Sequence, residues 1–218
     1  MGLINLTPAD EAILEAMKPV VEGIAAMSGG HTEVVLHGLD KSNPCIVKVA
    51  NGHVTGRSEG APVTDLAMGK LLEGQDVTPG YYTRTIDGKL LRSVTTIIRN
   101  GDGLAIGMLC INTNLDAPFQ EVVGAMVPHP TSMPCRDDSP ENFARNLDEL
   151  LHRAVARTRA AVEADEQTLP SLKNKVVIEQ LLKQGIFELK EAIQFVADYL
   201  GISHHTVYRH LRELKGRD

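Results

Sequence analysis

The 218-residue sequence has no tryptophan, four tyrosines, four phenylalanines and three cysteines. So few aromatic residues disfavour a flavin pocket, and no haem signal is present, so we expect no cofactor. Cys45, Cys110 and Cys135 are odd in number and far apart, which favours free thiols in a reducing compartment. No signal peptide pattern opens the chain, and the longest dense apolar run, 104–111, is far shorter than the roughly 18 residues of a membrane span. We therefore expect a cytoplasmic protein without a membrane segment.

Known catalytic and metal-binding signatures are also missing. The sequence has no Cys-x-x-Cys, no two histidines four apart, no P-loop, no Rossmann glycine fingerprint and no nucleophile elbow. An enzyme acting on a small polar metabolite would need titratable groups such as His37, His53 and Asp65 to converge in one cleft. We expect neither a metal site nor enzymatic activity.

Charge is unevenly distributed along the chain, whose net charge is −6. Residues 170–218 carry 8 Lys and Arg against 6 Asp and Glu, whereas the preceding residues carry 14 against 22. This asymmetry favours a modestly basic interaction module attached to an acidic body.

The first part of the chain has the pattern of an α+β module. Thr7 followed by Pro8 and Asp10 marks a helix start, and Thr64 can cap a short helix that ends near Gly74. Strands are predicted from apolar runs bounded by turn residues at 33–37, 46–50, 90–98 and 104–112. This order suits an antiparallel sheet with helices packed on one face.

A break follows, with prolines at 128, 130, 134 and 140. An amphipathic helix is predicted at 141–164, with Phe143, Leu147 and Leu151 among its apolar positions. It either packs on the domain before it or pairs with a second copy and couples the domains of a dimer. We thus predict a sensor-like domain at 1–125, a linker with this helix at 126–168, and a further domain at 169–218.

The last domain has the pattern of a helix-turn-helix. Helices are predicted at 173–184, 188–200 and 204–214, and Gly201-Ile202-Ser203 forms the turn between the last two. Gly201 supplies the positive φ that ends one helix, and Ser203 caps the next. A small helical bundle with a solvated charged face is the alternative, but this ordering of turn and cap residues is typical of Fis-like helix-turn-helix domains.

The third helix of this domain is the predicted DNA-recognition helix. Its 100° spacing turns Val207 and Leu211 inward and leaves the opposite side polar. His205 and Arg209 are expected to reach base edges in the major groove. The remaining candidates are expected to hold phosphates, through side chains or through backbone N–H groups at the helix N-terminus: Ser203, His204, Thr206, Tyr208 and Arg212.

The phrases Leu-Gly-Ile-Ser-His-His-Thr-Val-Tyr-Arg-His-Leu at 200–211 and Gly-Ile-Phe-Glu-Leu-Lys-Glu-Ala at 185–192 resemble the C-terminal domain of the YheO-like family of bacterial regulators. The segments 33–37, 51–58, 64–66 and 106–112 resemble that family's PAS-like domain. The family includes a repressor of D-arginine utilisation. The resemblance therefore implies a PAS sensor whose small-molecule ligand controls a DNA-binding dimer.

PAS-like domains bind ligands between the sheet and the middle helices, and the polar residues there are candidates. The loop 56–60 leads into the helix capped by Thr64, where a ligand carboxylate can meet Arg57 and a helix N-terminus. The alternative role for each of these side chains is to form hydrogen bonds with nearby backbone groups. The candidates are His37, Asn51, His53, Arg57, Ser58, Thr64, Asp65, Ser93, Thr95 and Asn112.

These observations predict a ligand-responsive repressor or activator whose partners are a double-stranded DNA operator, a small-molecule effector such as an amino acid or a derivative, and a second copy of the chain. A net charge of only +2 on 170–218 makes a lone domain a weak DNA binder, so the hypothesis requires at least a dimer. The alternative is a constitutive DNA-binding protein whose PAS-like domain only dimerises. A closed, apolar pocket would favour that alternative.

Overall fold

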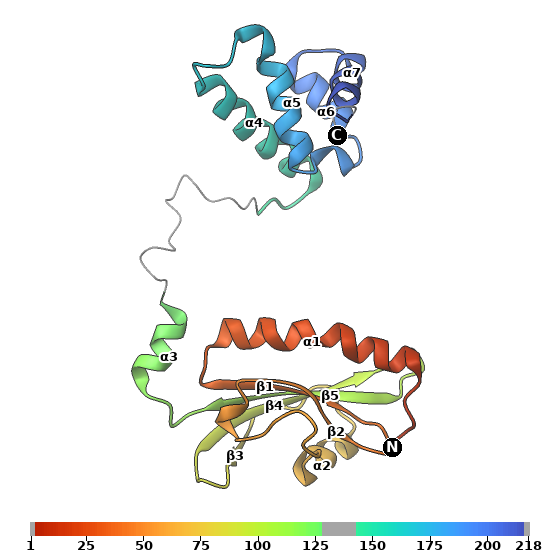
Figure 1. Ribbon diagram of the computed structural model, residues 1–218, viewed down its shortest axis with the longest axis vertical. Helices are drawn as coiled ribbons and strands as arrows, with labels where there is room; N and C mark the ends of the chain where they lie inside the picture. The colour runs from red at the N-terminus through yellow and green to blue at the C-terminus, as the bar shows by residue number, and fades with distance from the viewer. Residues whose placement is uncertain (1–2, 128–142, 216–218) are drawn as a thin grey trace. The chain divides into compact units, whose positions relative to one another are not determined.

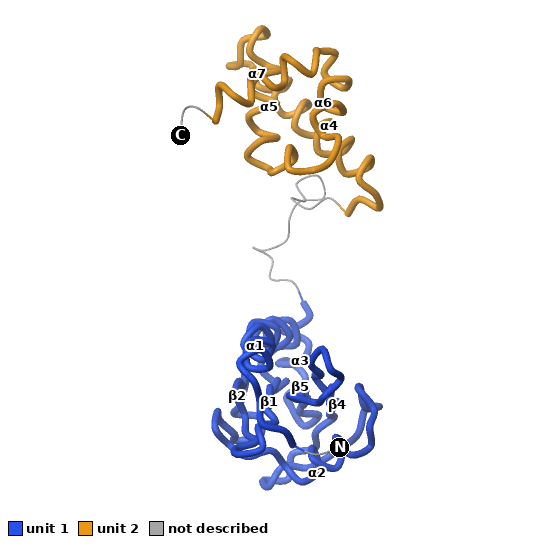
Figure 2. Tube along the Cα trace, turned by 90° about the vertical axis from the view of Figure 1, so that its right-hand side faces the viewer, with its two compact units in different colours: residues 1–133 blue, residues 134–218 orange. Residues whose placement is uncertain are grey.

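The computed structural model describes residues 3–127 and 143–215. The chain divides into two compact units, residues 1–133 and 134–218, which Figure 2 distinguishes by colour. Both units have apolar cores of their own. In the part of the chain that the structure describes, no helix combines the length and the apolar character needed to cross a membrane.

The N-terminal unit is built on a five-stranded sheet in which every neighbouring pair of strands is antiparallel. The strand order is β2-β1-β5-β4-β3 (Figure 1). The elements are α1 (Pro8–Ser28), β1 (Thr32–Gly38), β2 (Cys45–Ala50), the 3-10 turn η1 (Gly52–Val54), α2 (Asp65–Glu73), β3 (Tyr81–Arg84), β4 (Leu90–Arg99), β5 (Ala105–Asn114) and α3 (Phe119–Met126).

The two faces of this sheet are covered by different helices. Val34 and Leu36 of β1 pack in the cluster that contains α1, whereas Val35 packs in the cluster that contains α2. Figure 1 shows α1 along one face and α2 beyond the other. The expectation that helices cover only one face is therefore wrong. Both faces of β1 are buried, so each needs its own cover.

Local signals in the sequence position α1 closely on the sheet. Thr7 and Asp10 form a capping box, in which the Asp10 amide donates to Thr7 Oγ1 at 3.3 Å and the Thr7 amide donates to Asp10 Oδ2 at 2.9 Å. Gly107 of β5 lies beneath the helix. A Cβ there would lie 2.6 Å from Leu14 Cδ2 and 2.8 Å from the His37 carbonyl oxygen, so the close approach requires glycine.

One strand and one α-helix of this unit were not predicted from the sequence. β3 has only four residues, pairs on one side with β4 and forms an edge of the sheet. α3 follows the sheet and buries none of its residues. Short or exposed elements leave little hydrophobic pattern, since the pattern arises from burial of one face.

The C-terminal unit is helical and includes the helix that the sequence analysis assigned to the linker. Leu151, Val155 and Val162 of that helix are buried in the same cluster as the residues of the helix-turn-helix. This finding corrects the expected boundary at 169. The elements are α4 (Leu147–Ala164), η3 (Pro170–Leu172), α5 (Lys173–Lys183), η4 (Ile186–Glu188), α6 (Ala192–Leu200) and α7 (His204–Lys215).

α4 begins later than predicted. Asn146 caps it, because its Oδ1 accepts the Glu149 amide at 2.8 Å. Phe143 precedes the helix and is 77% exposed, so its expected place on the apolar face is wrong. The predicted start at 141 and the proline-rich segment 128–140 lie outside the described residues.

Candidate functional sites

A row of polar side chains crosses the α2-side face of the sheet. Antiparallel register places Glu33 of β1 opposite Asn112 of β5, Asn112 opposite Ser93 of β4, and Ser93 opposite Tyr81 of β3. Because directly paired residues project to the same face, the four side chains form one line across four strands.

A cavity of about 570 Å³ lies over this face. The size suits a small molecule, since ligand pockets are commonly a few hundred Å³. Its polar lining consists of His37, Thr55, Arg57, Thr64, Asp65, Tyr81, Thr83, Arg84, Thr85, Ser93, Cys110 and Asn112, and its apolar lining of Ala61, Pro62, Leu66, Ala67, Ile86 and Leu91.

His37 is the buried cavity residue with an unpaired polar atom. Its side chain is almost wholly buried, and Nε2 has no hydrogen-bond partner among the described residues. Nδ1 lies 3.9 Å from Cys110 Sγ. Burial, with a smaller contribution from the charge of Arg57, lowers the pKa of His37 to about 4. The ring is therefore neutral at physiological pH and can offer Nε2 to a ligand.

Glu33 is a functional candidate that the sequence analysis missed. It is fully buried, and it accepts hydrogen bonds from Thr55 Oγ1 at 2.6 Å and from Asn112 Nδ2 at 2.8 Å. Burial raises its pKa, although both hydrogen bonds oppose that shift. Because the Asn112 amide nitrogen donates to Glu33, its Oδ1 is left to accept from a ligand. The sequence did contain a signal for Glu33: in a strand, residues 33 and 37 project to the same face, so Glu33 lies on the face of the candidate His37.

The structure gathers most of the sequence-derived ligand candidates and separates the rest. His37, Arg57, Thr64, Asp65, Ser93 and Asn112 all line the cavity.

Four candidates do not line it. Asn51 has a left-handed backbone and donates from Nδ2 to the carbonyls of Gly29 and Thr32, at 3.1 and 2.8 Å. His53 and Ser58 are exposed, and Thr95 is buried with its Oγ1 2.8 Å from Tyr81 Oη. Asn51 and Thr95 thus satisfy local groups instead. Since His53 lies apart from the cavity, the three titratable residues considered for catalysis do not converge.

The loop before α2 is arranged only in part as expected. Arg57, Thr64 and Asp65 line the same cavity, and Arg57 Nη2 donates to the Pro62 carbonyl. However, Thr64 Oγ1 accepts the Ala67 amide at 3.2 Å, and Asp65 Oδ1 accepts the Leu66 amide at 2.8 Å. These two amides at the start of α2 are already paired, so Arg57 is the stronger anion partner there.

In the C-terminal unit, the turn before α7 has the predicted geometry. Gly201 has φ +65° and caps α6, with its amide directed at the Ala197 and Asp198 carbonyls. The Ile202 amide donates to the Ala197 carbonyl at 2.9 Å. Ser203 Oγ then accepts the Thr206 amide at 3.1 Å and starts α7.

α7 presents three sides. Val207 and Leu211 are buried in the core. His205, Arg209 and Arg212 are exposed on the side opposite these two. Glu213, the acidic residue within α7, binds Lys175 Nζ at 2.8 Å. The outward side of the helix is therefore a line of donors and cations.

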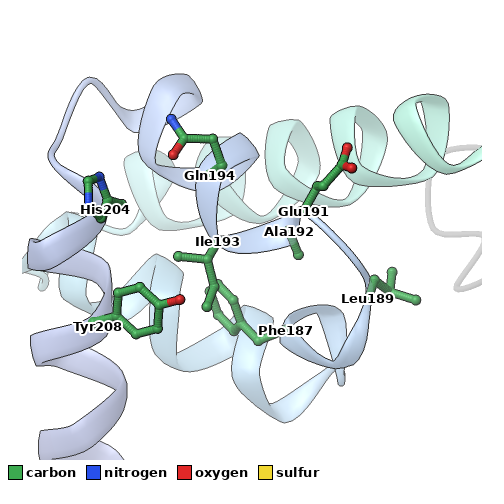
Figure 3. A pocket seen from close by; sticks show the side chains of 8 residues that line it. All are labelled: Phe187, Leu189, Glu191, Ala192, Ile193, Gln194, His204 and Tyr208. Atoms are coloured by element: carbon green, nitrogen blue, oxygen red, sulfur yellow. The ribbon is translucent and has the colours of Figure 1, made fainter.

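His204 and Tyr208 lie on a third side of α7, next to α6. A small hollow of about 250 Å³ is lined by these two residues together with Phe187, Ile193 and Gln194, among others. Figure 3 shows the Tyr208 ring facing Ile193 and Phe187, with His204 one turn away. Thr206 and Ser203 are engaged with each other, with their hydroxyl oxygens 3.0 Å apart. All seven predicted DNA-binding residues are thus at or near the surface, but on different sides.

Comparison with known protein families finds a match for each of the two units. The profile of the YheO-like PAS domain matches residues 8–128, and that of an HTH domain matches residues 147–212. The chain belongs to the YheO-like family. The second match begins at the first residue of α4, in accord with the packing of α4 in the C-terminal unit.

Curated relatives span nearly the whole chain. The uncharacterized protein YheO of Escherichia coli K12 is 39% identical over 225 residues, covering 100% of this chain and 92% of the relative. The transcriptional regulator DauR of Pseudomonas aeruginosa is 29% identical, covering 96% of this chain and 98% of DauR. Family and architecture together make this YheO-like protein a transcriptional regulator with a PAS-like domain and a helix-turn-helix domain.

A comparison with solved structures also returned partial matches. A light-oxygen-voltage domain studied with a flavin analogue aligns with a TM-score of 0.34 and 17% identity, covering 51% of this chain and 94% of that chain.

Proposed function

We propose that this regulator is ligand-responsive: the N-terminal unit binds a small polar molecule, and a homodimer of the chain binds a double-stranded DNA operator through α7. The observation that carries the proposal is the buried His37 Nε2, which has no partner in the described part of the chain and belongs to a residue lining a cavity of about 570 Å³. Leaving a buried polar atom unpaired costs about 1–3 kcal/mol, which a ligand hydrogen bond would recover.

The alternative, in which the PAS-like domain only dimerises, fits this cavity less well. A purely dimerising domain has no need of a polar interior. Here a carboxylate, two hydroxyl-bearing side chains and an amide lie in one row across four strands. Such polar side chains are costly to bury unless they are paired, so their concentration beside an open volume supports a binding role.

The chemistry of the lining favours a ligand that carries both charges. Arg57 and Arg84 supply cations, and Asp65 supplies a carboxylate. The Asn112 amide oxygen and the neutral His37 ring add directional hydrogen bonds deeper in the cavity. A zwitterion such as an amino acid or a derivative matches this set, because its carboxylate pairs with a guanidinium and its ammonium with a carboxylate.

The DNA-binding part of the proposal rests on the outward side of α7. His205 and Arg209 are one turn apart and exposed, as residues reading successive base edges in the major groove must be. Residues 134–218 carry 13 Lys and Arg against 14 Asp and Glu, a net charge of −1, so a single unit supplies little non-specific affinity. Two units binding half-sites about one helical turn apart would supply the rest.

The test is binding of the full-length protein to the DNA upstream of its own gene, with and without each of the common amino acids, followed by anisotropy. We expect one or a few of them to change the dissociation constant at least fivefold and to raise the Tm. Ser93→Ile, which places a larger side chain in the cavity, should abolish both responses while leaving ligand-free DNA binding intact.

Thr96→Ile is the matched control, because Thr96 lies on the same strand and does not line the cavity. The control should keep the ligand response. If no small molecule changes DNA affinity or Tm, or if Ser93→Ile leaves a response unchanged, the sensor function is wrong and the dimerising alternative stands.

A further inference from the structure

α1 has a second apolar side that the N-terminal unit leaves exposed. Ala9, Ile13, Ala16, Val20, Gly23 and Met27 follow one another at spacings of four and three, and none of them is buried. Met27 is 84% exposed, Val20 40% and Ile13 37%. The five spacings average 3.6 residues, the period of the α-helix, and keep all six residues within an arc of roughly 80°. Alternation of four and three is also the spacing of a seam between two helices.

Apart from the buried Asp10, the charged residues of α1 lie on another side of the helix. Glu11, Glu15, Lys18 and Glu22 fall within an arc of about 60°, and they are separated from the exposed apolar seam by the small flanking residues Ala12, Pro19 and Ala26. A solvated helix side would carry charge, as this narrow arc does. The seam and its flank form a mostly apolar strip along α1. Because a specific interface must bury at least about 1,000 Å² over the two copies, a partner has to cover the whole length of this strip.

Gly23 lies inside α1 and has no function within the unit. Glycine in a helix interior costs about 1 kcal/mol relative to alanine. Its φ is not positive, and a Cβ built on it would meet nothing within 4 Å. None of the described residues of the N-terminal unit therefore requires glycine at this position, whereas a neighbouring helix packed closely on the seam would.

The order of small and large side chains along the seam fits an antiparallel copy of itself. We consider two α1 helices paired about a two-fold axis that crosses the seam at the level of Lys18. Ala9 then faces Met27, Ile13 faces Gly23, and Ala16 faces Val20. Each layer then joins one small and one larger side chain, as interdigitated packing requires. A parallel pair would place Met27 against Met27 and Gly23 against Gly23, which leaves alternating bulges and gaps.

The surface beside Ala9 adds to this fit. A hollow of about 310 Å³ there is lined by Ala9, Ile13, Leu104 and residues of the β4–β5 turn. In the antiparallel register, Met27 of the second copy lies next to this hollow. An unbranched, adaptable side chain such as methionine suits an irregular gap of this kind.

We propose that the chain dimerises through an antiparallel pairing of α1 helices from two N-terminal units, with Ala16 and Val20 at the centre of the interface. This replaces the pairing of α4 helices considered from the sequence, since the apolar side of α4 is already buried in the C-terminal unit. The inference specifies the homodimer of the proposed function. It places the dimer contact on the unit that holds the cavity.

The primary test is the mass of the full-length protein by sedimentation velocity. Wild type should be a dimer. Ala16→Glu places a carboxylate at the seam and should raise the dimer dissociation constant at least tenfold, while a far-UV spectrum and Tm close to wild type show that it folds. Lys18→Glu is the matched control, since it adds negative charge to α1 roughly 160° away from Ala16, and it should remain a dimer.

A second variant tests the register. In Ala16→Glu combined with Val20→Lys, each introduced carboxylate faces an introduced ammonium of the other copy if the helices are antiparallel, so dimerisation should return. In a parallel pair like charges would face each other, and the double variant would stay monomeric, which would overturn the proposed register.

A monomeric wild type, or a dimer that Ala16→Glu leaves unchanged, would overturn the interface. A dimer broken instead by Phe119→Glu would move it to α3, whose Phe119 is 77% exposed. The measured quantity is mass and not DNA affinity. The absence of a ligand response therefore does not contradict the α1 interface. A monomeric protein likewise does not contradict ligand binding by the cavity.

Discussion

The sheet face beside the cavity and the outward side of α7 carry similar polar side chains, but those on the sheet are buried and those on α7 are exposed. His37, Glu33 and Ser93 are polar groups buried on a sheet, whereas His205 and Arg209 are polar groups exposed on one helix. Burial shifts the pKa of both His37 and Glu33, in opposite directions. The ionisation of His37 and Glu33 is therefore coupled to folding stability, whereas the proposed role of the α7 groups is DNA binding.

This difference predicts how each region responds to substitution and to pH. Changes on α7 should leave Tm almost unchanged and alter DNA affinity. Changes in the cavity should alter stability in a pH-dependent way even in the absence of ligand. The following predictions are ordered from the largest expected effect to the smallest.

Arg209→Ala should weaken binding to the operator by about 10- to 100-fold, because a bidentate arginine contact to a guanine is worth about 1–3 kcal/mol. Tm should stay within a degree of wild type, since Arg209 is exposed. Lys183→Ala, which removes an exposed cation at the end of α5, is the matched control and should bind as wild type does. An equal loss in both variants would place the DNA contact elsewhere.

His37→Leu should make the protein less sensitive to acid. The pKa of His37 falls to about 4 in the folded protein, below the ordinary 6.5, so the neutral ring is favoured by folding. The stability this contributes is present above pH 6.5 and is lost as the pH falls toward 4, by about 2 kcal/mol at pH 5.

Thermal unfolding of the full-length protein at pH 7.5 and pH 5 measures this effect. The loss of Tm on acidification should be smaller in His37→Leu than in wild type. His53→Ala removes an exposed histidine of the same unit and should behave as wild type. Identical acid sensitivity in all three proteins would contradict a neutral, buried His37.

Tyr208→Phe should weaken specific and non-specific DNA binding alike, by roughly two- to tenfold, because a hydroxyl that holds a phosphate carries no sequence information. The ring can still pack beside Phe187 and Ile193. Competition with operator and random duplexes measures both affinities. A loss confined to the operator would make Tyr208 a base-reading residue and enlarge the set on α7.

Glu33→Gln should raise Tm by a few degrees at pH 7.5. Burial raises the pKa of Glu33, so its contribution to stability is full below the ordinary 4.5 and is lost as the pH rises through the folded value. Glutamine removes the buried charge, its Oε1 can accept from Asn112 Nδ2, and its Nε2 can donate to the Thr55 hydroxyl, which can also act as an acceptor. The advantage should shrink as the pH approaches 4.5, opposite to the trend for His37. A lower Tm at pH 7.5 would mean that the charged form is favoured by folding.

The extent to which each site was predictable follows from its geometry. α7 was predicted at 204–214 and spans His204–Lys215, with Val207 and Leu211 buried as its periodicity indicated. β1 was also predicted, but the partnership of its Glu33 with Asn112, 79 residues away, was not. Asn51 and Thr95 do not line the cavity, because their side chains bond groups 14 to 22 residues away, and residue type alone does not reveal such distant partners.

By itself, the sequence determined the helix-turn-helix, the side of α7 that faces outward and the presence of an antiparallel α+β unit before it. These features depend on residues within three or four positions of one another, on caps such as Ser203 and on turns such as Gly201. Only the tertiary structure decided that α4 belongs to the C-terminal unit, that α1 and α2 cover opposite faces of the sheet, and that Glu33 and His37 belong to one polar face. These depend on strand register and on which apolar side finds a cover, and both are set by contacts between residues distant in the chain.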